Sequence, residues 1–381
     1  MNLESKIKDF SKGIGIDLIG ITSAEPFNDV ERVFIERIEK GYYRNFNYNS
    51  ERVKFICNPK KILPDAKSII SIALSYNVHV EEIENELREN SNNTLSKDQK
   101  NKEVRNSYNI CSNKRATGSK ENTGIISKFA WGIDYHKVLK DKLKILANFI
   151  SRKLLKDSKK SFKYEILVDT GPIVDRAVAN RAGIGWYGKN CNIITKRFGS
   201  WVLLGEIVTN LKLKPDEPYF ENCGDCDLCI RACPTGAIIS PYVIDIRKCI
   251  SHLTQKKGEI PMNLLEKMGR NIYGCDICQN VCPLNKEADF VEKDYFLPIP
   301  PRSKNIDLLP LVCMSEIEFN IRFKNSTISW VGKDVLRRNA IIALGNIGES
   351  NSMDFLSKAT EDEDEIIKKY ADWAINKIKD R

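Results

Sequence analysis

Apolar positions along the first 220 residues alternate between helical and extended spacing. Residues 1–20 have the pattern of an amphipathic helix that leads into a short strand, DLIGIT at 17–22, and a second helix is expected at 28–40. The segment SIISIALSYN at 68–77 is short, apolar and rich in β-branched residues, which is typical of a buried strand. Because strands and helices alternate in this way, we expect an α/β or α+β domain.

The same reading predicts a long helix and further extended segments. A Lys-rich amphipathic helix begins near Tyr135, and YEILVDTGP at 164–172 reads as a strand that ends in a turn. NIITKRFGSWVLLGEIVTN at 192–210 predicts a β-hairpin, with Gly199 in its turn. Residues 79–122 are polar and have almost no apolar periodicity, so we expect a long surface insertion there.

A Pro-rich connector, FLPIPPRSKNIDLLP at 296–310, precedes the last part of the chain. The segments at 329–350 and 353–378 then predict antiparallel helix pairs. The sequence Ala-Leu-Gly-Asn-Ile-Gly that closes the first segment resembles a HEAT-type helical repeat. So few helices make only one or two repeat units, and they must pack on the rest of the protein.

Composition is that of an ordinary globular protein with a basic centre. The 381 residues are 42% hydrophobic, and no apolar run approaches the ~18 residues that span a bilayer. The start, MNLESKIKDF, lacks the pattern of a secretory signal, so a cytoplasmic protein is expected. The net charge is +9, and residues 123–220 hold 18 Lys or Arg against 9 Asp or Glu. This basic segment indicates either a polyanionic partner such as nucleic acid or a solvated helix surface.

Two cysteine runs carry the strongest chemical signal. Eight of the twelve cysteines lie within 60 residues, which in a large chain without a signal peptide indicates metal binding. The runs are CGDCDLCIRACP and CDICQNVCP, and in a C-x2-C-x2-C-x3-C-P run the fourth Cys binds the other cluster. Two ligand sets for four-iron clusters follow: Cys223, Cys226, Cys229 and Cys282, and then Cys233, Cys275 and Cys278 with Cys249 as the local candidate for the fourth place. Structural zinc is the alternative, but two Cys-Pro endings match two [4Fe-4S] clusters better.

Over nearly its whole length the sequence resembles epoxyqueuosine reductase. The resemblance is carried by five segments and the HEAT-like tail: WGIDYHKVL (131–139), VDTGPIVDRAVANRAGIGWYGKN (168–190), CGDCDLCIRACPTGAI (223–238), RKCISHLTQKKGEIP (247–261) and GRNIYGCDICQNVCPLN (269–285). It implies reduction of epoxyqueuosine to queuosine at the wobble position of tRNA, the last step of queuosine biosynthesis. It also implies cobalamin without a protein ligand to cobalt, reduced through the two clusters.

The resemblance implies an α+β chain with three domains. These are a cobalamin-binding catalytic α/β domain at 1–215, a ferredoxin-like two-cluster domain at 216–290 and a HEAT-like tRNA-binding domain at 305–381. The expected partners are tRNA and a low-potential electron donor, without a membrane, and the family favours a monomer. A reductive dehalogenase and an electron-carrier module are the alternative functions.

The resemblance places the family's proton donor on Asp169. A carboxylic acid suits this role, because an opened epoxide leaves an alkoxide that needs a proton. For this role, burial against the corrin is expected to raise the pKa of Asp169. The alternative is a purely structural role, in which Asp169 caps the turn after its strand. Asp134 matches a polar residue of the family's pocket or caps the following helix. Ser127 stands where some relatives have a Cys facing cobalt. Ile193, Leu204 and Ser251 are expected to line the corrin and its nucleotide tail.

For tRNA, the Lys-rich helix that begins near Tyr135 and a face formed around five further basic residues supply candidate phosphate contacts. These five are Arg176, Arg181, Lys189, Lys256 and Lys257. The HEAT-like helices would hold the anticodon arm through Lys333, Arg337 and Arg338, unless these form an ordinary solvated helix start. The wobble base would leave its stack to reach the cobalamin.

Overall fold

A computed structural model describes most of the chain, in five stretches: residues 2–43, 48–79, 122–157, 161–299 and 305–381. The predicted insertion at 79–122 therefore lies almost wholly outside the described residues. The chain forms two compact units, each built from separate stretches of sequence: 1–77, 135–247 and 277–291 in the first, and 78–134, 248–276 and 292–381 in the second. The three-domain organisation by function stays a prediction.

The first unit is built on a four-stranded antiparallel sheet with the order β1-β2-β7-β4. The strands are β1 (Leu18–Ser23), β2 (Ser68–Ser75), β7 (Val202–Thr209) and β4 (Tyr164–Leu167). Every residue of β2 is buried, as its apolar run predicts. The predicted strands at 17–22, 68–77 and 164–172 are confirmed, and the mixture of helices with an antiparallel sheet makes the unit α+β.

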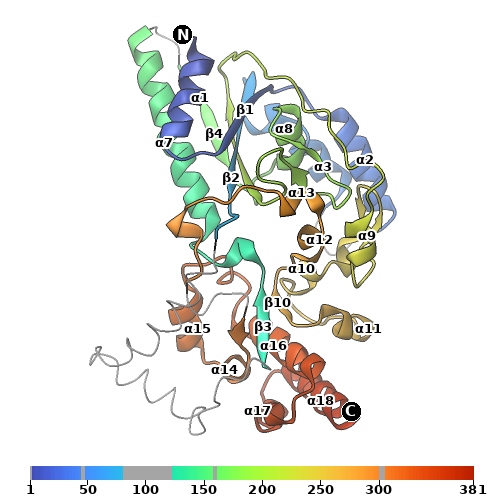
Figure 1. The fold of residues 1–381 in the computed structure, drawn as a ribbon. Helices are drawn as coiled ribbons and strands as arrows, with labels where there is room; N and C mark the ends of the chain where they lie inside the picture. The colour runs from blue at the N-terminus through green and yellow to red at the C-terminus, as the bar shows by residue number, and fades with distance from the viewer. Residues whose placement is uncertain (1, 44–47, 80–121, 158–160, 300–304) are drawn as a thin grey trace, which may run out of the picture. The chain divides into compact units, whose positions relative to one another are not determined.

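Helices cover both faces of this sheet (Figure 1). On one face, α7 (Tyr135–Asp157) packs on β7 and β4, and α1 (Leu3–Gly13) packs on α7 through the stacked rings of Phe10 and Phe149. On the other face lies α8 (Asp175–Arg181), whose Ala179 packs with Leu204 of β7. The remaining helices before β2 are α2 (Asn28–Glu39), α3 (Ser50–Ile56) and α4 (Pro59–Ile62). The predicted helices at 28–40 and from Tyr135 are thus confirmed.

The hairpin predicted at 192–210 is wrong, although its turn is present. Gly199 has a left-handed φ of 54° and forms a single bridge with Thr195. Beyond that turn the two segments part: β6 (Ile193–Ile194) pairs with β5 (Trp186–Tyr187), whereas β7 pairs with β2 and β4. Strand β2 pairs along the whole of β7 and β4 pairs along residues 206–209, so the partners of β7 come from distant parts of the chain. The Gly signal located the turn correctly, but strand pairing depends on distant segments.

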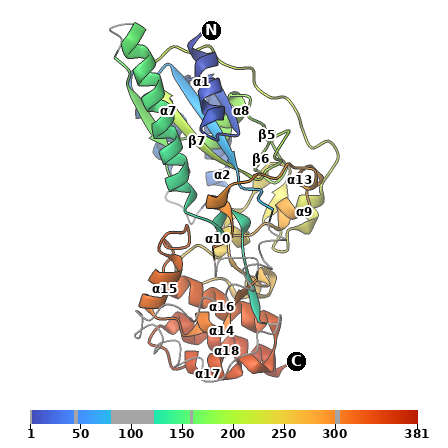
Figure 2. The same cartoon turned by 60° about the vertical axis from the view of Figure 1, so that its left-hand side comes forward.

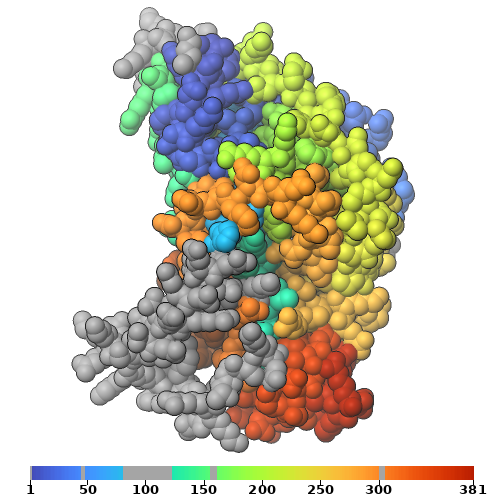
Figure 3. Space-filling view, in the orientation of Figure 1, coloured from blue at the N-terminus to red at the C-terminus, as the bar shows by residue number. Residues whose placement is uncertain are grey.

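Short elements carry the first cysteine run and most of the second within the first unit. They are α9 (Leu228–Ala232), β8 (Ile238–Ser240), β9 (Val243–Ile244), α12 (Ile277–Asn280) and α13 (Pro283–Lys286). Helices α9 and α12 pack on each other, although about 50 residues separate them in the chain. The yellow segment around residue 225 reaches the surface in the face shown in Figure 3.

The second unit combines a small sheet with helices from the end of the chain (Figure 2). In the sheet, β3 (Thr123–Ile126) lies between β10 (Asn271–Tyr273), which is parallel to it, and β11 (Ile306–Asp307), which is antiparallel. The main helices are α14 (Leu309–Val312), α15 (Glu316–Phe323), α16 (Lys333–Ile347), α17 (Met353–Ala359) and α18 (Glu365–Lys379), with the shorter α10 (Ile250–Leu253) and α11 (Met262–Leu265).

The predicted carboxyl-terminal helices are present, and α16 packs on both β10 and α18. Most residues of α16 from Val335 to Gly345 are buried, which is why this helix has no extended polar face. The HEAT-like assignment stays a prediction. None of the described helices combines the length and apolarity that a bilayer crossing requires.

Candidate active site and cluster ligands

Asp169 sits in the turn that directly follows β4. Its φ of 48° is left-handed, a conformation that Asp adopts more readily than most residues. Tyr135 donates its hydroxyl to Asp169 Oδ2 over 2.8 Å, and His136 Nε2 lies 3.2 Å from the same oxygen. The carboxyl group is therefore held by side chains of α7. Within the described residues no backbone amide of the turn donates to it, which does not support the alternative that Asp169 caps its turn.

Tyr135 and His136 occupy the first turn of α7, and their rings stack with centroids 4.1 Å apart. The His136 side chain is 22% exposed and that of Asp169 is 51% exposed. The sequence analysis missed both residues, because it assigned a role only to Asp134 in the segment WGIDYHKVL. The available signal was that His136 is one of three histidines in the chain and stands inside a motif of the resemblance.

The protein's own groups lower the pKa of Asp169. Partial burial acts to raise it, but hydrogen bonds from His136 and Tyr135, with the positive charges of His136 and Arg176, outweigh burial and lower the pKa below its ordinary value. The predicted rise depends on burial against the corrin and stays a prediction; the protein's own groups act downward, because side chains on α7 stabilise the charged carboxylate. At neutral pH Asp169 is ionised, so a proton for chemistry at this site has to reach it from a neighbouring group.

The residues expected to line the corrin fall in different surroundings. Ile193 and Leu204 are brought together in the core between the sheet and α8, where they are 3% and 9% exposed. Ser251 lies in α10 and accepts a hydrogen bond from Gln255. Ser127 is buried and donates its hydroxyl to Asp276, which also accepts the backbone N–H of Lys128.

Asp134 directly precedes α7 and is partly exposed. Its backbone N–H donates to the carbonyl of Asn325 over 3.1 Å. Both roles considered for its side chain stay predictions.

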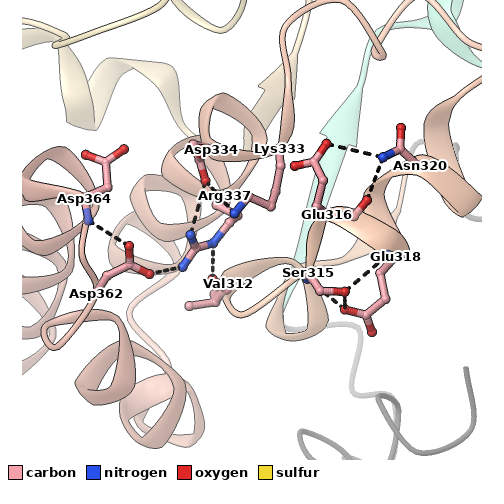
Figure 4. Close-up of polar contacts among 10 residues, drawn as sticks. All are labelled: Val312, Ser315, Glu316, Glu318, Asn320, Lys333, Asp334, Arg337, Asp362 and Asp364. Atoms are coloured by element: carbon pink, nitrogen blue, oxygen red, sulfur yellow. Dashed lines mark hydrogen bonds and ion pairs between the residues drawn. The ribbon is translucent and has the colours of Figure 1, made fainter. Parts of the chain in front are cut away.

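Arg337 and Arg338 correct the sequence analysis, because neither can offer its charge to a phosphate. Arg337 is 7% exposed and is held by Asp334, Asp362 and the carbonyl of Val312 (Figure 4). Arg338 is 1% exposed, and its guanidinium donates to the carbonyls of Leu253, Lys256 and Gly258. Both side chains serve to join α16 to neighbouring segments of the second unit. The sequence analysis expected them to contact tRNA, or else to form a solvated helix start, but α16 is buried on most sides.

The other candidate cations differ in exposure and in how far protein groups already occupy their charged ends. Arg176 is exposed and donates to the carbonyl of Cys191 over 2.8 Å. Arg181 lies over the ring of Phe27, with its guanidinium carbon 3.5 Å from the centroid, and donates to the carbonyls of Ser23 and Glu25. The ammonium groups of three lysines contact protein groups: Lys189 donates to the carbonyl of Gly224, Lys256 donates to the carbonyl of Glu259, and Lys333 pairs with Asp334. Lys257 is exposed.

Four cysteines from the two runs gather in the first unit. Burial raises the pKa of Cys229 to about 11, and the negative charges of Cys223, Cys282 and Cys226 raise it further. Burial likewise raises the pKa of Cys282, where Cys223 and Cys226 again contribute. The charges of Cys223, Cys226 and Cys282 thus act on Cys229, and these four cysteines are the set predicted for the first cluster, which stays a prediction.

The second predicted set is divided between the two compact units. Cys233 and Cys278 belong to the first unit, and Cys249 and Cys275 belong to the second. Cys233 Sγ accepts the backbone N–H of Ala237 over 3.3 Å. Hydrogen bonds of this kind to a cysteine sulfur tune the potential of a cluster. Outside both sets, Cys57 and Cys191 are buried, where a free cysteine acts as a small apolar side chain.

Comparison with known proteins identifies the chain's relatives. The family model for a 4Fe-4S double cluster binding domain matches residues 222–285, and that for epoxyqueuosine reductase QueG matches residues 103–170. The epoxyqueuosine reductase of Bacillus cereus is 39% identical over 99% of this chain and 89% of its own length. That of Bacillus subtilis is 36% identical over 99% of this chain and 88% of its own.

Solved structures give the same result. An epoxyqueuosine reductase bound to an epoxyqueuosine-modified stem loop of tyrosine tRNA aligns with a TM-score of 0.83 and 36% identity, over 99% of this chain and 90% of that one. A Bacillus subtilis epoxyqueuosine reductase, with the loop of its catalytic aspartate swung out of the active site, aligns with a TM-score of 0.82 and 35% identity over the same shares. The chain therefore belongs to the epoxyqueuosine reductase family.

Proposed function

We propose that Asp169, His136 and Tyr135 deliver protons in the reaction of this family, the reduction of epoxyqueuosine to queuosine at the wobble position of tRNA. The chain is an epoxyqueuosine reductase by its relatives, and its cofactors are cobalamin and two [4Fe-4S] clusters. The observation that carries the residue assignment is the contact of Tyr135 and His136 with one oxygen of Asp169.

The chemistry defines what these residues must do. Conversion of an epoxide to an alkene takes up two electrons and two protons, breaks both C–O bonds and releases the oxygen as water. When bound, the cofactors supply the electrons one at a time. The protein must protonate the oxygen as each bond breaks, and a positioned acid of this kind contributes about 10²–10⁴-fold to rate. Asp169 is the group we assign to this task.

His136 and Tyr135 give Asp169 its orientation and its proton. Tyr135 fixes one carboxyl oxygen, and a fixed orientation lowers the entropy cost of proton transfer. Because Asp169 is ionised at neutral pH, we assign the first proton to the His136–Asp169 pair, in which His136 Nε2 faces the carboxylate. Asp169 then passes that proton to the epoxide oxygen.

The donor sets on the chain fit both cofactors. The mutual charge of Cys223, Cys226, Cys229 and Cys282 fits a four-iron cluster. We propose that Cys233, Cys249, Cys275 and Cys278 hold the second cluster. The only histidine of the first unit, His136, is turned to Asp169, which fits cobalamin held without a histidine on cobalt.

We infer that tRNA phosphates contact the exposed side chains Lys257 and Arg176. Lys189, Lys256, Lys333 and Arg181 stay candidates, with the ammonium or guanidinium groups partly occupied by protein carbonyls and carboxylates. Arg337 and Arg338 are no longer among them. The helices α16 to α18 would hold the anticodon arm as a HEAT-like unit. We infer a monomer that works in the cytoplasm with a low-potential electron donor.

The test is single-turnover reduction of epoxyqueuosine tRNA by anaerobically reconstituted protein, with and without cobalamin, beside Asp169→Asn. We expect queuosine only with cobalamin, and a loss of at least about 10²-fold in the variant. Glu165→Gln, an exposed residue of the same strand segment, is the matched control and should keep the wild-type rate. Full activity of Asp169→Asn would remove Asp169 from the reaction, and no queuosine from wild-type protein with both cofactors would remove the activity itself.

A further inference from the structure

Glu206 lies at the centre of the first unit's sheet and is fully buried. On β7 it stands opposite Ser71 of β2 and Leu167 of β4, and Ser71 stands opposite Gly20 of β1. These residues form one row across all four strands. Neither carboxyl oxygen of Glu206 has a hydrogen-bond partner within the described part of the chain, and the hydroxyl of Ser71 has none either.

The row faces α8. A Cβ on Gly20 would meet the carbonyl oxygen of Ala182, at the end of α8, at 2.0 Å. A Cβ on Gly205, the neighbour of Glu206, would instead meet Leu143 of α7 at 3.0 Å. Because successive side chains of a strand point to opposite faces, Glu206 points toward α8.

The surroundings of Glu206 keep it protonated. An unpaired buried carboxylate costs several kcal/mol, so the neutral acid is favoured. Burial raises the pKa of Glu206 well above its ordinary value, and the negative charges of Asp175 and Asp169 act in the same direction. The charged groups that act on Glu206 are Asp175 on α8 and Asp169 after β4. Arg176 of α8 acts in turn on both of these carboxyl groups, and His136 of α7 contacts Asp169.

Glu206 is also close to the proposed proton donor. Asp169 follows Leu167, the direct strand partner of Glu206, by two residues. Asp169 lies past the end of β4, and its negative charge acts on Glu206, so the two carboxyl groups are near one another. A protonated acid thus lies beside an ionised one.

We propose that Glu206 is an internal proton store that reprotonates the Asp169 site and so supplies the second of the two protons that epoxide reduction consumes. This inference rests on the proposed function. The His136–Asp169 pair gives its proton as the first C–O bond breaks. Glu206 then gives its own to the Asp169 carboxylate, which passes it to the departing oxygen, and Glu206 regains a proton from solvent between turnovers. Glu206 acts through Asp169 and is a positioning residue in this sense.

The test is Glu206→Gln, which keeps the shape and removes the proton. We expect single-turnover queuosine formation to slow by about tenfold or more, with cobalamin and iron contents unchanged. In the pH profile, the wild-type rate should fall at alkaline pH as Glu206 loses its proton. This alkaline fall should be absent from the profile of Glu206→Gln. Ser71→Ala, a neighbour in the same buried row, is the matched control and should keep the wild-type rate and profile.

If Glu206→Gln showed the rate and pH profile of the wild type, the proposal would be overturned. Glu206→Asp keeps a carboxyl group, so it should restore much of the rate with the alkaline fall at a different pH. If Glu206→Gln does not fold, the Asp variant decides by itself: an alkaline fall at a different pH supports the proposal and one at the wild-type pH overturns it. Because wild-type protein is measured beside each variant, failure of the reductase activity itself would be seen separately.

Discussion

Asp169 and Arg338 are both charged residues within segments that resemble the family, but their surroundings give them opposite tasks. Asp169 is half exposed, and side chains of α7 stabilise its charge where a substrate can approach. Arg338 is 1% exposed, and main-chain carbonyls take up its donors. A charge that is both buried and satisfied holds a structure together, whereas an exposed and oriented charge is available for chemistry.

His136 gives the first prediction at this scale. In His136→Gln, Asp169 keeps the hydrogen bond from Tyr135 but loses the imidazole that shares its proton. We expect the single-turnover rate to fall by about 10–100-fold, with cobalamin and iron contents unchanged. His79→Gln, an exposed histidine in the second unit, is the control and should behave as wild type. An unchanged rate in His136→Gln would leave Asp169 without its assigned proton source.

His252 gives a pH-dependent prediction. Burial lowers the pKa of His252 to about 4, and the charge of Lys256 lowers it further, so the folded chain keeps this imidazole neutral. The unfolded chain binds the proton at its ordinary pKa of about 6.5, so the stabilisation is complete above pH 6.5 and is lost as the pH falls toward 4. Between pH 7 and 5.5, denaturant unfolding should show a loss of about 1 kcal/mol more in wild type than in His252→Gln, allowing for solvent screening. Equal losses would contradict the prediction.

At the scale of elements, the close packing of α8 on the sheet sets the geometry of the candidate site. Gly20 of β1 allows the carbonyl of Ala182 to approach, because a side chain there would meet it. The other end of α8 carries Asp175 and Arg176, whose charges act on Asp169. The position of this short helix therefore affects both the core and the electrostatics of the site.

Gly20→Ala tests this packing. The new methyl group would lie 2.0 Å from a backbone oxygen, so α8 must shift, and we expect a loss of about 1–3 kcal/mol in the free energy of unfolding. Gly13→Ala is the matched control, because a Cβ at this last residue of α1 meets nothing within 4 Å. It should be neutral or stabilising by up to about 1 kcal/mol. Equal stability of the two variants, measured by denaturant unfolding, would show that α8 does not need the glycine.

At the scale of the whole molecule, the two predicted cluster ligand sets draw on segments that are distant in sequence. Cys282 joins the charges of Cys223 and Cys226 across α9 and α12. The second predicted ligand set draws on both compact units. Loss of one cysteine should therefore remove one cluster and leave the other.

Cys226→Ser tests the first ligand set. We expect the iron content to fall from about eight to about four atoms per chain, because one four-iron cluster loses a ligand. Cys313→Ser, a cysteine outside both runs, is the control and should keep the wild-type content. Iron analysis with electron paramagnetic resonance of the reduced protein gives the measurement. A wild-type iron content in Cys226→Ser would show that the ligand set is different.

Binding of the tRNA stem loop gives a second prediction for the whole molecule. Lys257→Ala should weaken binding and reduce the slope of log affinity against log salt by about one, as expected for one lost phosphate contact. Arg338→Ala should instead destabilise the fold, because it breaks buried hydrogen bonds without removing a phosphate contact. A salt slope unchanged in Lys257→Ala would exclude this residue from the tRNA interface.

The sequence by itself determined the features that depend on local spacing. The period of apolar residues located β2 and α7, and the spacing of the cysteines predicted the double-cluster segment that the family comparison confirms. Asp169 was singled out through its motif. The inferences on β2, α7 and the double-cluster segment held because side-chain periodicity and ligand spacing are properties of neighbouring residues, whereas the role of Asp169 stays a prediction.

Only the tertiary structure decided which distant groups meet. His136 and Asp169 are 33 residues apart, and their contact lowers a pKa that burial against the corrin is predicted to raise. Strand β7 pairs with β2 and β4 and not with the segment just before it, and packing around α16 buried Arg337 and Arg338. Pairing, burial and local charge are set by residues far along the chain, and the same local pattern is compatible with several such arrangements.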